Sequence, residues 1–309
     1  MLAFSFTAPR ISKDDELRER ATLNEQDLEE IKQDMYGNHG ANEVFAVDGP
    51  STMAVLRDLE HIDVSNKEDY LEALKRCPEL VKEESNIEAF LQCEKGDVSC
   101  AASRLVQYWR MRKFLFGERA FLPMTWEKGA LVEEDRQVLK LGVYNILPSD
   151  KHGRGVLFID MDKLRAMTKV EDRKRMVRAA FYTLQIMKKN PSVRANGVVV
   201  VSTIKMDTPT NFNRKLYKLL WDCIGNAAPL YIRAFHAVNQ SFIMDLMLQE
   251  LKHFIGKKIR LRLKVHKVDT ARAVLGELET YKLQTSKLPV MLGGTYNEVN
   301  NYWVGSKAL

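Results

Sequence analysis

The stretch Asn196-Gly-Val-Val-Val-Val-Ser-Thr-Ile204 decides the fold class of this 309-residue chain. It opens with an Asn-Gly turn signal and continues as a run rich in β-branched residues. A short run that is apolar at consecutive positions, rather than at every second one, is typical of a strand covered on both faces. The pattern therefore predicts a buried strand over 198–204, in a sheet with helices packed against it.

Strand and helix patterns alternate on both sides of this stretch. Before it, Val156–Asp160 forms another short apolar run, and residues 171–189 place apolar side chains along one helical face. The segments after it are a helix over 211–224, a strand over 231–238, a helix over 241–256, a strand over 259–265 and a short helix from Thr270. This order predicts an α/β fold with right-handed crossovers between its strands.

The N-terminal part of the chain shows helical patterns only, because no strand pattern occurs before about residue 140. A clear helix begins at Asp97, a good N-cap residue, and carries Ala101, Leu105 and Trp109 on one face. The expected organisation is an acidic, partly mobile extension over 1–50, a helical lobe over 51–125, a sheet-containing domain over 126–296 and a tail over 297–309.

Charge is distributed unevenly along the chain. Residues 1–95 hold 11 Lys and Arg against 22 Asp and Glu, a net charge of −11, whereas residues 96–309 hold 36 against 19, a net charge of +17. A basic body favours an anionic partner such as an acidic membrane surface, a phosphorylated ligand or nucleic acid. Nucleic acid is disfavoured, because the basic residues are not interleaved with aromatic residues and no nucleic-acid-binding motif is present.

Other classes of protein are excluded by motifs that the sequence lacks. The longest apolar run is far shorter than the roughly 20 residues of a membrane-spanning helix. Four cysteines without C-x-x-C spacing argue against a zinc site or a disulfide framework. No dinucleotide, P-loop or nucleophile-elbow motif occurs. We therefore expect an intracellular protein that is not an enzyme and has no cofactor. Asp160 and Asp162 follow a strand, and we interpret them as capping residues.

Two segments carry positive signals. The helix over 241–256 is unusually apolar, which fits a core helix, a helix facing a hydrophobic ligand or one that dips into a membrane surface. The alternating strand over 259–265 places basic residues on one face, where they could be solvated or could contact a phosphate. These basic residues are Lys258, Arg260, Arg262 and Lys264.

Three phrases together resemble the CRAL-TRIO family of lipid-binding proteins. Phe90-Leu-Gln-Cys-Glu-Lys-Gly-Asp-Val98, continuing to Trp109-Arg110, resembles the family's N-terminal phrase. Gly153-Arg-Gly-Val-Leu-Phe-Ile-Asp160 resembles its opening strand. The third phrase resembles the C-terminal part of the family's domain. It consists of Phe235-His-Ala-Val-Asn239, then Phe254-Ile255 and Lys258-Ile259, and finally Leu288-Pro-Val-Met-Leu-Gly-Gly294. The resemblance spans about residues 86–296.

The resemblance implies an α/β fold, in which a helical N-terminal lobe is followed by a mixed β-sheet flanked by helices around an apolar pocket. It implies a gate near 241–256 and a function in extracting, shielding and presenting a lipid. Under it, the pocket is predicted to be lined by Phe158, Phe181, Val199, Val201, Phe212, Leu216, Phe235, Phe242, Leu246 and Met247. The expected ligand is a phospholipid or another hydrophobic small molecule.

The polar end of the ligand is assigned by the same resemblance. Lys258 matches a headgroup lysine of the family, and Arg260 is a weaker second candidate. Phosphatidylinositol binders carry an acid before the strand that begins here near Tyr231, but this chain has Pro229-Leu230 in its place. We expect a cytoplasmic protein with transient association with an anionic membrane surface.

Two other hypotheses remain open at this point. The chain could be a scaffold or regulatory module that keeps this fold and binds a protein partner or a membrane surface without lipid transfer. In either case the acidic residues of 1–50 could lie on the basic body as an electrostatic lid. An enzyme would rest on Asp160 and Asp162 alone.

Overall fold

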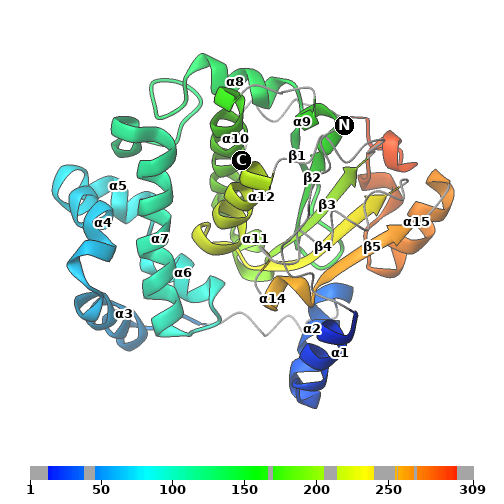
Figure 1. The fold of residues 1–309 in the computed structure, drawn as a ribbon, viewed down its shortest axis with the longest axis horizontal. Coiled ribbons are helices and arrows are strands. Elements are labelled where there is room, and N and C mark those ends of the chain that lie inside the picture. The colour runs from blue at the N-terminus through cyan, green and yellow to red at the C-terminus, as the bar shows by residue number, and fades with distance from the viewer. Residues whose placement is uncertain are drawn as a thin grey trace, which may run out of the picture.

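The structure is a computed structural model, and it describes residues 13–37, 46–165, 170–204, 214–239, 255, 257–267 and 270–297. Two short helices, α1 (Lys13–Ala21) and α2 (Glu25–Tyr36), come first. Asn24 caps α2, and Gly37 ends it in the left-handed conformation that glycine adopts without strain. Helix α2 packs against β4, and both helices lie beside the ends of β4 and β5 (Figure 1).

The helical lobe is confirmed. It consists of α3 (Gly49–His61), α4 (Val64–Arg76), α5 (Pro78–Glu84), α6 (Ile87–Cys93), α7 (Val98–Phe116) and η1 (Gly117–Phe121). Asp97 caps α7 by accepting a hydrogen bond from the backbone of Cys100. The predicted apolar face of α7 is buried, including Ala101, Leu105 and Trp109. Because α7 contacts α3, α4 and α6, it forms the centre of the lobe.

A five-stranded mixed sheet follows, in the order β1-β2-β3-β4-β5. The strands are β1 (Tyr144–Leu147), β2 (Gly155–Asp160), β3 (Val198–Ile204), β4 (Ile232–Asn239) and β5 (Leu263–Lys267). The pair β1–β2 is antiparallel and the other three pairs are parallel. The strands predicted before β5 are all present. Strand β1 was not predicted, because four residues do not provide a recognisable period.

The connecting helices cover the sheet. They are α8 (Glu133–Lys140), α9 (Met161–Arg165), α10 (Val170–Lys189), α11 (Pro191–Asn196), α12 (Arg214–Trp221), the π-helical turn η3 (Asp222–Ala227), α14 (Lys257–Arg260), α15 (Ala271–Thr280), η4 (Thr285–Lys287) and η5 (Val290–Leu292). Helices α10 and α12 lie between the sheet and α7, and α15 lies beyond β5 (Figure 1).

Each sheet face has its own apolar core. The α10-side core takes Leu157 and Val200 from the strands and packs them with side chains of α7, α10 and α12. The α15-side core takes Phe158 and Val199, and packs them with Leu278 of α15 and other C-terminal residues. Successive strand residues point to opposite faces, so this division follows directly from the two-residue period of a strand.

The expected basic strand over 259–265 is wrong in its first half. Residues 257–260 form the helical turn α14, and β5 starts only at Leu263, where it pairs with Phe235. Arg262 is buried, so Arg262 and Arg260 do not share an exposed strand face. Alternating polarity over four residues does not separate one helical turn from a strand, because both place side chains on different sides.

A buried histidine pair links β4, β5 and α15 on the α15 side. Nδ1 of His236 lies 2.9 Å from Nε2 of His266, and Nδ1 of His266 lies 2.6 Å from a carboxylate oxygen of Glu277. Both rings also contact Tyr281. Burial lowers the pKa of His236 well below its usual value, and the nearby His266, Arg154 and Lys264 lower it further. His236 is therefore neutral in the folded protein.

This histidine should make folding sensitive to mild acid. An unfolded histidine binds a proton below about pH 6.5, whereas folded His236 does not, so stability falls as the pH drops below that value. Between pH 7.5 and 5.5 the wild-type free energy of unfolding should fall by about 1.4 kcal/mol more than that of His236→Gln. Urea denaturation at the two pH values measures this difference, and equal losses in the two proteins would contradict the assignment.

Candidate functional site

The sheet divides the predicted pocket residues between its two faces. Phe181 and Leu216 belong to the α10-side core, and half-buried Phe235 packs against it. Phe158, Val199 and Val201 belong to the α15-side core. A single pocket cannot be lined by both groups, because the sheet itself lies between them. Phe212, Phe242, Leu246 and Met247 lie outside the described residues.

An apolar strip on the α10 side is only half-covered by protein. Phe235 of β4 is paired in register with Leu263 of β5, and the next residue on this face of β5 is Val265; all three are half-buried. Leu219 and Ile259 are also half-buried and pack against the α10-side core. We call these five residues the apolar strip. An incompletely covered apolar surface inside an α/β fold is a candidate site for a hydrophobic ligand.

A cavity of about 420 Å³ lies next to the strip, between α6, α7, η3 and α14, and Ile259 of the strip is one of its lining residues. Its cationic lining residues are Arg104, Lys257 and Arg262. Arg104 is paired with Glu94 and donates to the carbonyl of Ala228. The cavity therefore combines cationic groups with one carboxylate, that of Glu94. The described residues contain no cluster of side chains that could hold a metal ion.

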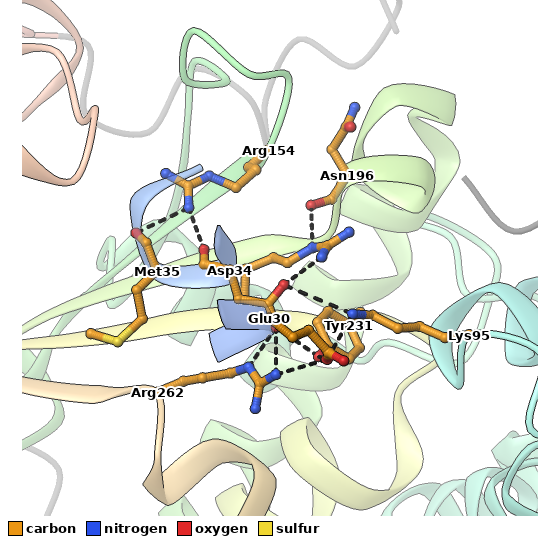
Figure 2. A network of polar contacts seen from close by, with 9 residues as sticks. Glu30, Asp34, Met35, Lys95, Arg154, Asn196, Tyr231 and Arg262 are labelled. Carbon is orange, nitrogen blue, oxygen red and sulfur yellow. Dashed lines mark hydrogen bonds and ion pairs between the residues drawn. The ribbon is translucent and has the colours of Figure 1, made fainter. Parts of the chain in front are cut away.

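Helix α2 supplies a buried carboxylate beside this cavity. Asp34 is fully buried and accepts hydrogen bonds from Arg233, from Nε of Arg262 at 2.6 Å and from the Tyr231 hydroxyl at 2.8 Å. Figure 2 shows these groups converging on α2. Burial by itself raises the pKa of Asp34, but the charges of Arg233, Arg262 and Lys95 outweigh burial and hold the pKa below its usual value of 3.8. Asp34 is therefore an anion at neutral pH.

Other contacts fasten the same helix. Glu30 accepts from Arg262 at 3.0 Å and from Lys95 at 2.9 Å. Arg154, from the predicted Gly153-Arg154-Gly155 turn, donates to the carbonyl oxygen of Asp34 at 2.6 Å, where it satisfies the end of α2. These contacts could not be predicted from the sequence, because they join residues more than 60 positions apart.

The predicted headgroup residues lie at the edge of this region. Arg260 binds Glu19 of α1 through two nitrogens and donates to the carbonyl of Ile255 at 2.7 Å. The backbone of Lys258 belongs to α14, but its side chain lies outside the described part of the structure. The interpretation of Asp160 as a capping residue agrees with the hydrogen bond that it accepts from the backbone of Lys163 at 3.3 Å.

Comparison with known proteins gives consistent matches. A model of the CRAL/TRIO domain matches residues 139–294. The alpha-tocopherol transfer protein-like protein of Homo sapiens is 27% identical over 219 residues, which cover 68% of this chain and 58% of that protein. The protein of the same name from Mus musculus is also 27% identical, over 170 residues that cover 53% of this chain and 47% of that protein. The chain thus spans about half of their length. The crystal structure of Sfh5 matches with a TM-score of 0.51 and 14% identity, over 84% of this chain and 96% of the other.

Neutralising Asp34 should destabilise the protein, because the Asp34→Asn substitution removes the buried counter-charge of Arg233 and leaves Arg262 with Glu30 alone. We expect a loss of about 3 kcal/mol in the free energy of unfolding, measured by urea denaturation at pH 7. Glu29→Gln is the matched control on the same helix, since Glu29 pairs with Lys32 at the surface. It should cost less than about 0.5 kcal/mol. Equal effects of the two substitutions would contradict the role of Asp34.

Proposed function

The chain belongs to the CRAL/TRIO domain family, and we propose that it binds a hydrophobic lipid in an internal pocket and transfers or presents it between membranes. Members of this family are generally lipid-binding and transfer proteins. The names of the relatives refer to alpha-tocopherol transfer, which supports a hydrophobic ligand here. The fold also fits, because it agrees with that of Sfh5 along most of both chains.

The apolar strip is the observation that carries this proposal. Phe235 and Leu263 lie in neighbouring strands of the sheet, where full burial would be expected, yet both are half-buried. A hydrocarbon chain placed on them removes further apolar surface from water, at about 25 cal/mol for each Å² covered. The α10 side is accordingly the face on which we place the pocket, with Phe181 and Leu216 at its inner wall. Phe158, Val199 and Val201 are not part of it.

The gate is assigned to residues 241–256 from their apolar sequence. All of this segment except Ile255 lies outside the described residues. The described chain reaches Asn239 at the end of β4 and resumes near the start of α14. Among the described residues, no helix has both the length and the apolar character needed to cross a bilayer.

Membrane contact and an anionic headgroup are finer parts of the proposal. The net charge of +17 over residues 96–309 supports attraction to an anionic surface. Lys258 remains the residue proposed for a charged headgroup. Arg260 is a weaker candidate, because Glu19 already engages its guanidinium. Binding and release of a lipid require no covalent step, and we propose no enzymatic activity.

Lipid uptake is the direct test. Purified native protein should yield a stoichiometric lipid when its organic extract is examined by mass spectrometry. The protein stripped of that lipid should extract α-tocopherol or phosphatidylinositol from vesicles. Leu246→Asp should reduce uptake at least tenfold while the circular dichroism spectrum is unchanged, because a charge replaces an apolar gate residue. Leu141→Asp, at an exposed leucine in the described part of the chain, is the matched control and should bind normally.

A protein that is empty and extracts neither lipid would favour the scaffold hypothesis. Normal uptake by Leu246→Asp would remove the gate assignment and leave lipid binding intact.

The headgroup assignment is tested separately by Lys258→Ala. Loss of a cation should weaken phosphatidylinositol binding about fivefold and leave α-tocopherol unaffected, because only the first ligand carries a phosphate. Lys151→Ala, in an exposed turn, is the control. Vesicle-extraction titrations give both affinities, and equal losses for the two ligands would rule out a headgroup contact.

A further inference from the structure

Two hydroxyl groups lie in one row across the α10-side face of the sheet. Tyr144 of β1 pairs with Ile159 of β2, and Ile159 pairs with Ser202 of β3. Ile159 belongs to the α10-side core. Residues that are paired directly across neighbouring strands point to the same face, so Tyr144 and Ser202 face the same side as the apolar strip. The row continues to Ala237 of β4 and then to Val265, a member of the strip.

Neither hydroxyl has a hydrogen-bond partner among the described residues. Tyr144 is 0% exposed and Ser202 is 1% exposed, yet the Tyr144 hydroxyl and Ser202 Oγ are both unpaired. Buried polar atoms are nearly always paired, and an unpaired hydroxyl costs about 1–3 kcal/mol. Other buried polar atoms, such as Thr203 Oγ1, are unpaired as well. Tyr144 and Ser202 differ from Thr203 in lying together in one row on the face that carries the apolar strip.

The described side chains around this row are uncharged. The strand residues on this face whose side chains the structure describes are Tyr144, Ile146, Leu157, Ile159, Val198, Val200, Ser202, Ile232, Phe235, Ala237, Leu263 and Val265, and none of them is charged. Lys267 ends β5 on the same face by register, and its side chain lies outside the described part of the structure. Across from the sheet, Cys223 and Tyr217 approach Tyr144, and burial raises the pKa of the Tyr144 hydroxyl well above 10. Tyr144 is therefore a neutral donor, and a phosphate beside it would contact no cation among the described side chains of this face.

We infer that Tyr144 and Ser202 form the polar end of the lipid pocket and bind an uncharged oxygen, a hydroxyl or carbonyl group, of a lipid whose hydrocarbon part lies on the apolar strip. This inference rests on the proposed function and makes it more specific. Each hydroxyl can both donate and accept a hydrogen bond, so the pair suits an alcohol or a carbonyl compound. A hydrocarbon without oxygen would leave both groups unpaired.

The test uses two probes that differ only in oxygen: radiolabelled oleyl alcohol and 9-octadecene, offered in phosphatidylcholine vesicles to lipid-free protein. Tyr144→Phe and Ser202→Ala remove one oxygen each and keep the apolar shape. Each should weaken oleyl alcohol binding about fivefold and change 9-octadecene binding less than twofold, because only the alcohol loses a hydrogen bond. Ligand-free Tyr144→Phe should melt at the wild-type temperature or above, since the substitution deletes an unpaired buried group.

Thr203→Val is the matched control. Thr203 follows Ser202 in β3, its Oγ1 is also unpaired and buried, and it pairs with Val238, a residue of the α15-side core. Its hydroxyl therefore points away from the proposed pocket, and its removal should leave the binding of both probes unchanged. Equal weakening by Thr203→Val and Ser202→Ala would overturn the assignment.

The outcomes separate this inference from the proposed function. If wild-type protein binds both probes and neither Tyr144→Phe nor Ser202→Ala discriminates between them, the inference is overturned and lipid binding stands. A native extract that contains only phosphate-bearing lipid, bound independently of Tyr144 and Ser202, also overturns it. A wild-type protein that takes up no probe and carries no native lipid overturns both.

Discussion

Strands β2 to β5 run parallel, and β2, β3 and β4 each turn apolar side chains toward two opposite faces, so neither face of the sheet can be left to water. Burying one valine or leucine side chain contributes about 1.5–3 kcal/mol, and the strands bring many of them. Helices α10 and α12 cover one face, and α15 with the C-terminal turns covers the other. The half-buried strip beside β5 is where the cover on the α10 side is incomplete, and this gives the sheet a place for a hydrophobic ligand.

Buried arginines near the ends of the strands need counter-charges, and helix α2 supplies one of them. Arg154, Arg233 and Arg262 are buried near one end of the sheet, and a buried cation costs several kcal/mol unless it is paired. Asp34 of α2 provides the charge for Arg233 and Arg262. Arg154 takes its counter-charge from Asp150 at 2.6 Å and also donates to the carbonyls at the end of α2. The acidic character of the N-terminal segment thus has a structural basis: α2 is a component of the packed domain.

The cavity beside α7 and the sheet face under α10 and α12 differ in the charge of the side chains that line them. The cavity beside α7 contains cations that are largely matched by the protein's own carboxylates, as Arg104 is by Glu94. The sheet face under α10 and α12 contains apolar side chains and the neutral hydroxyls of Tyr144 and Ser202. A lipid bound on this face would be read mainly by its hydrocarbon shape and by one uncharged oxygen, so recognition depends on burial and hydrogen bonding more than on charge.

The sequence by itself determined the local elements. The valine run of β3, the period of α10 and the N-cap at Asp97 predicted strands and helices where they occur, because each depends on neighbouring residues. The alternation of strand and helix patterns predicted the α/β fold, and the three family phrases added a lipid as ligand class. Tertiary structure alone decided the remainder: the pairing of β1, the turn α14 in place of a strand, the attachment of α2 and the face to which each strand residue points. The physical reason is that pairing, burial and counter-charge come from residues distant in the chain, and no local period records them.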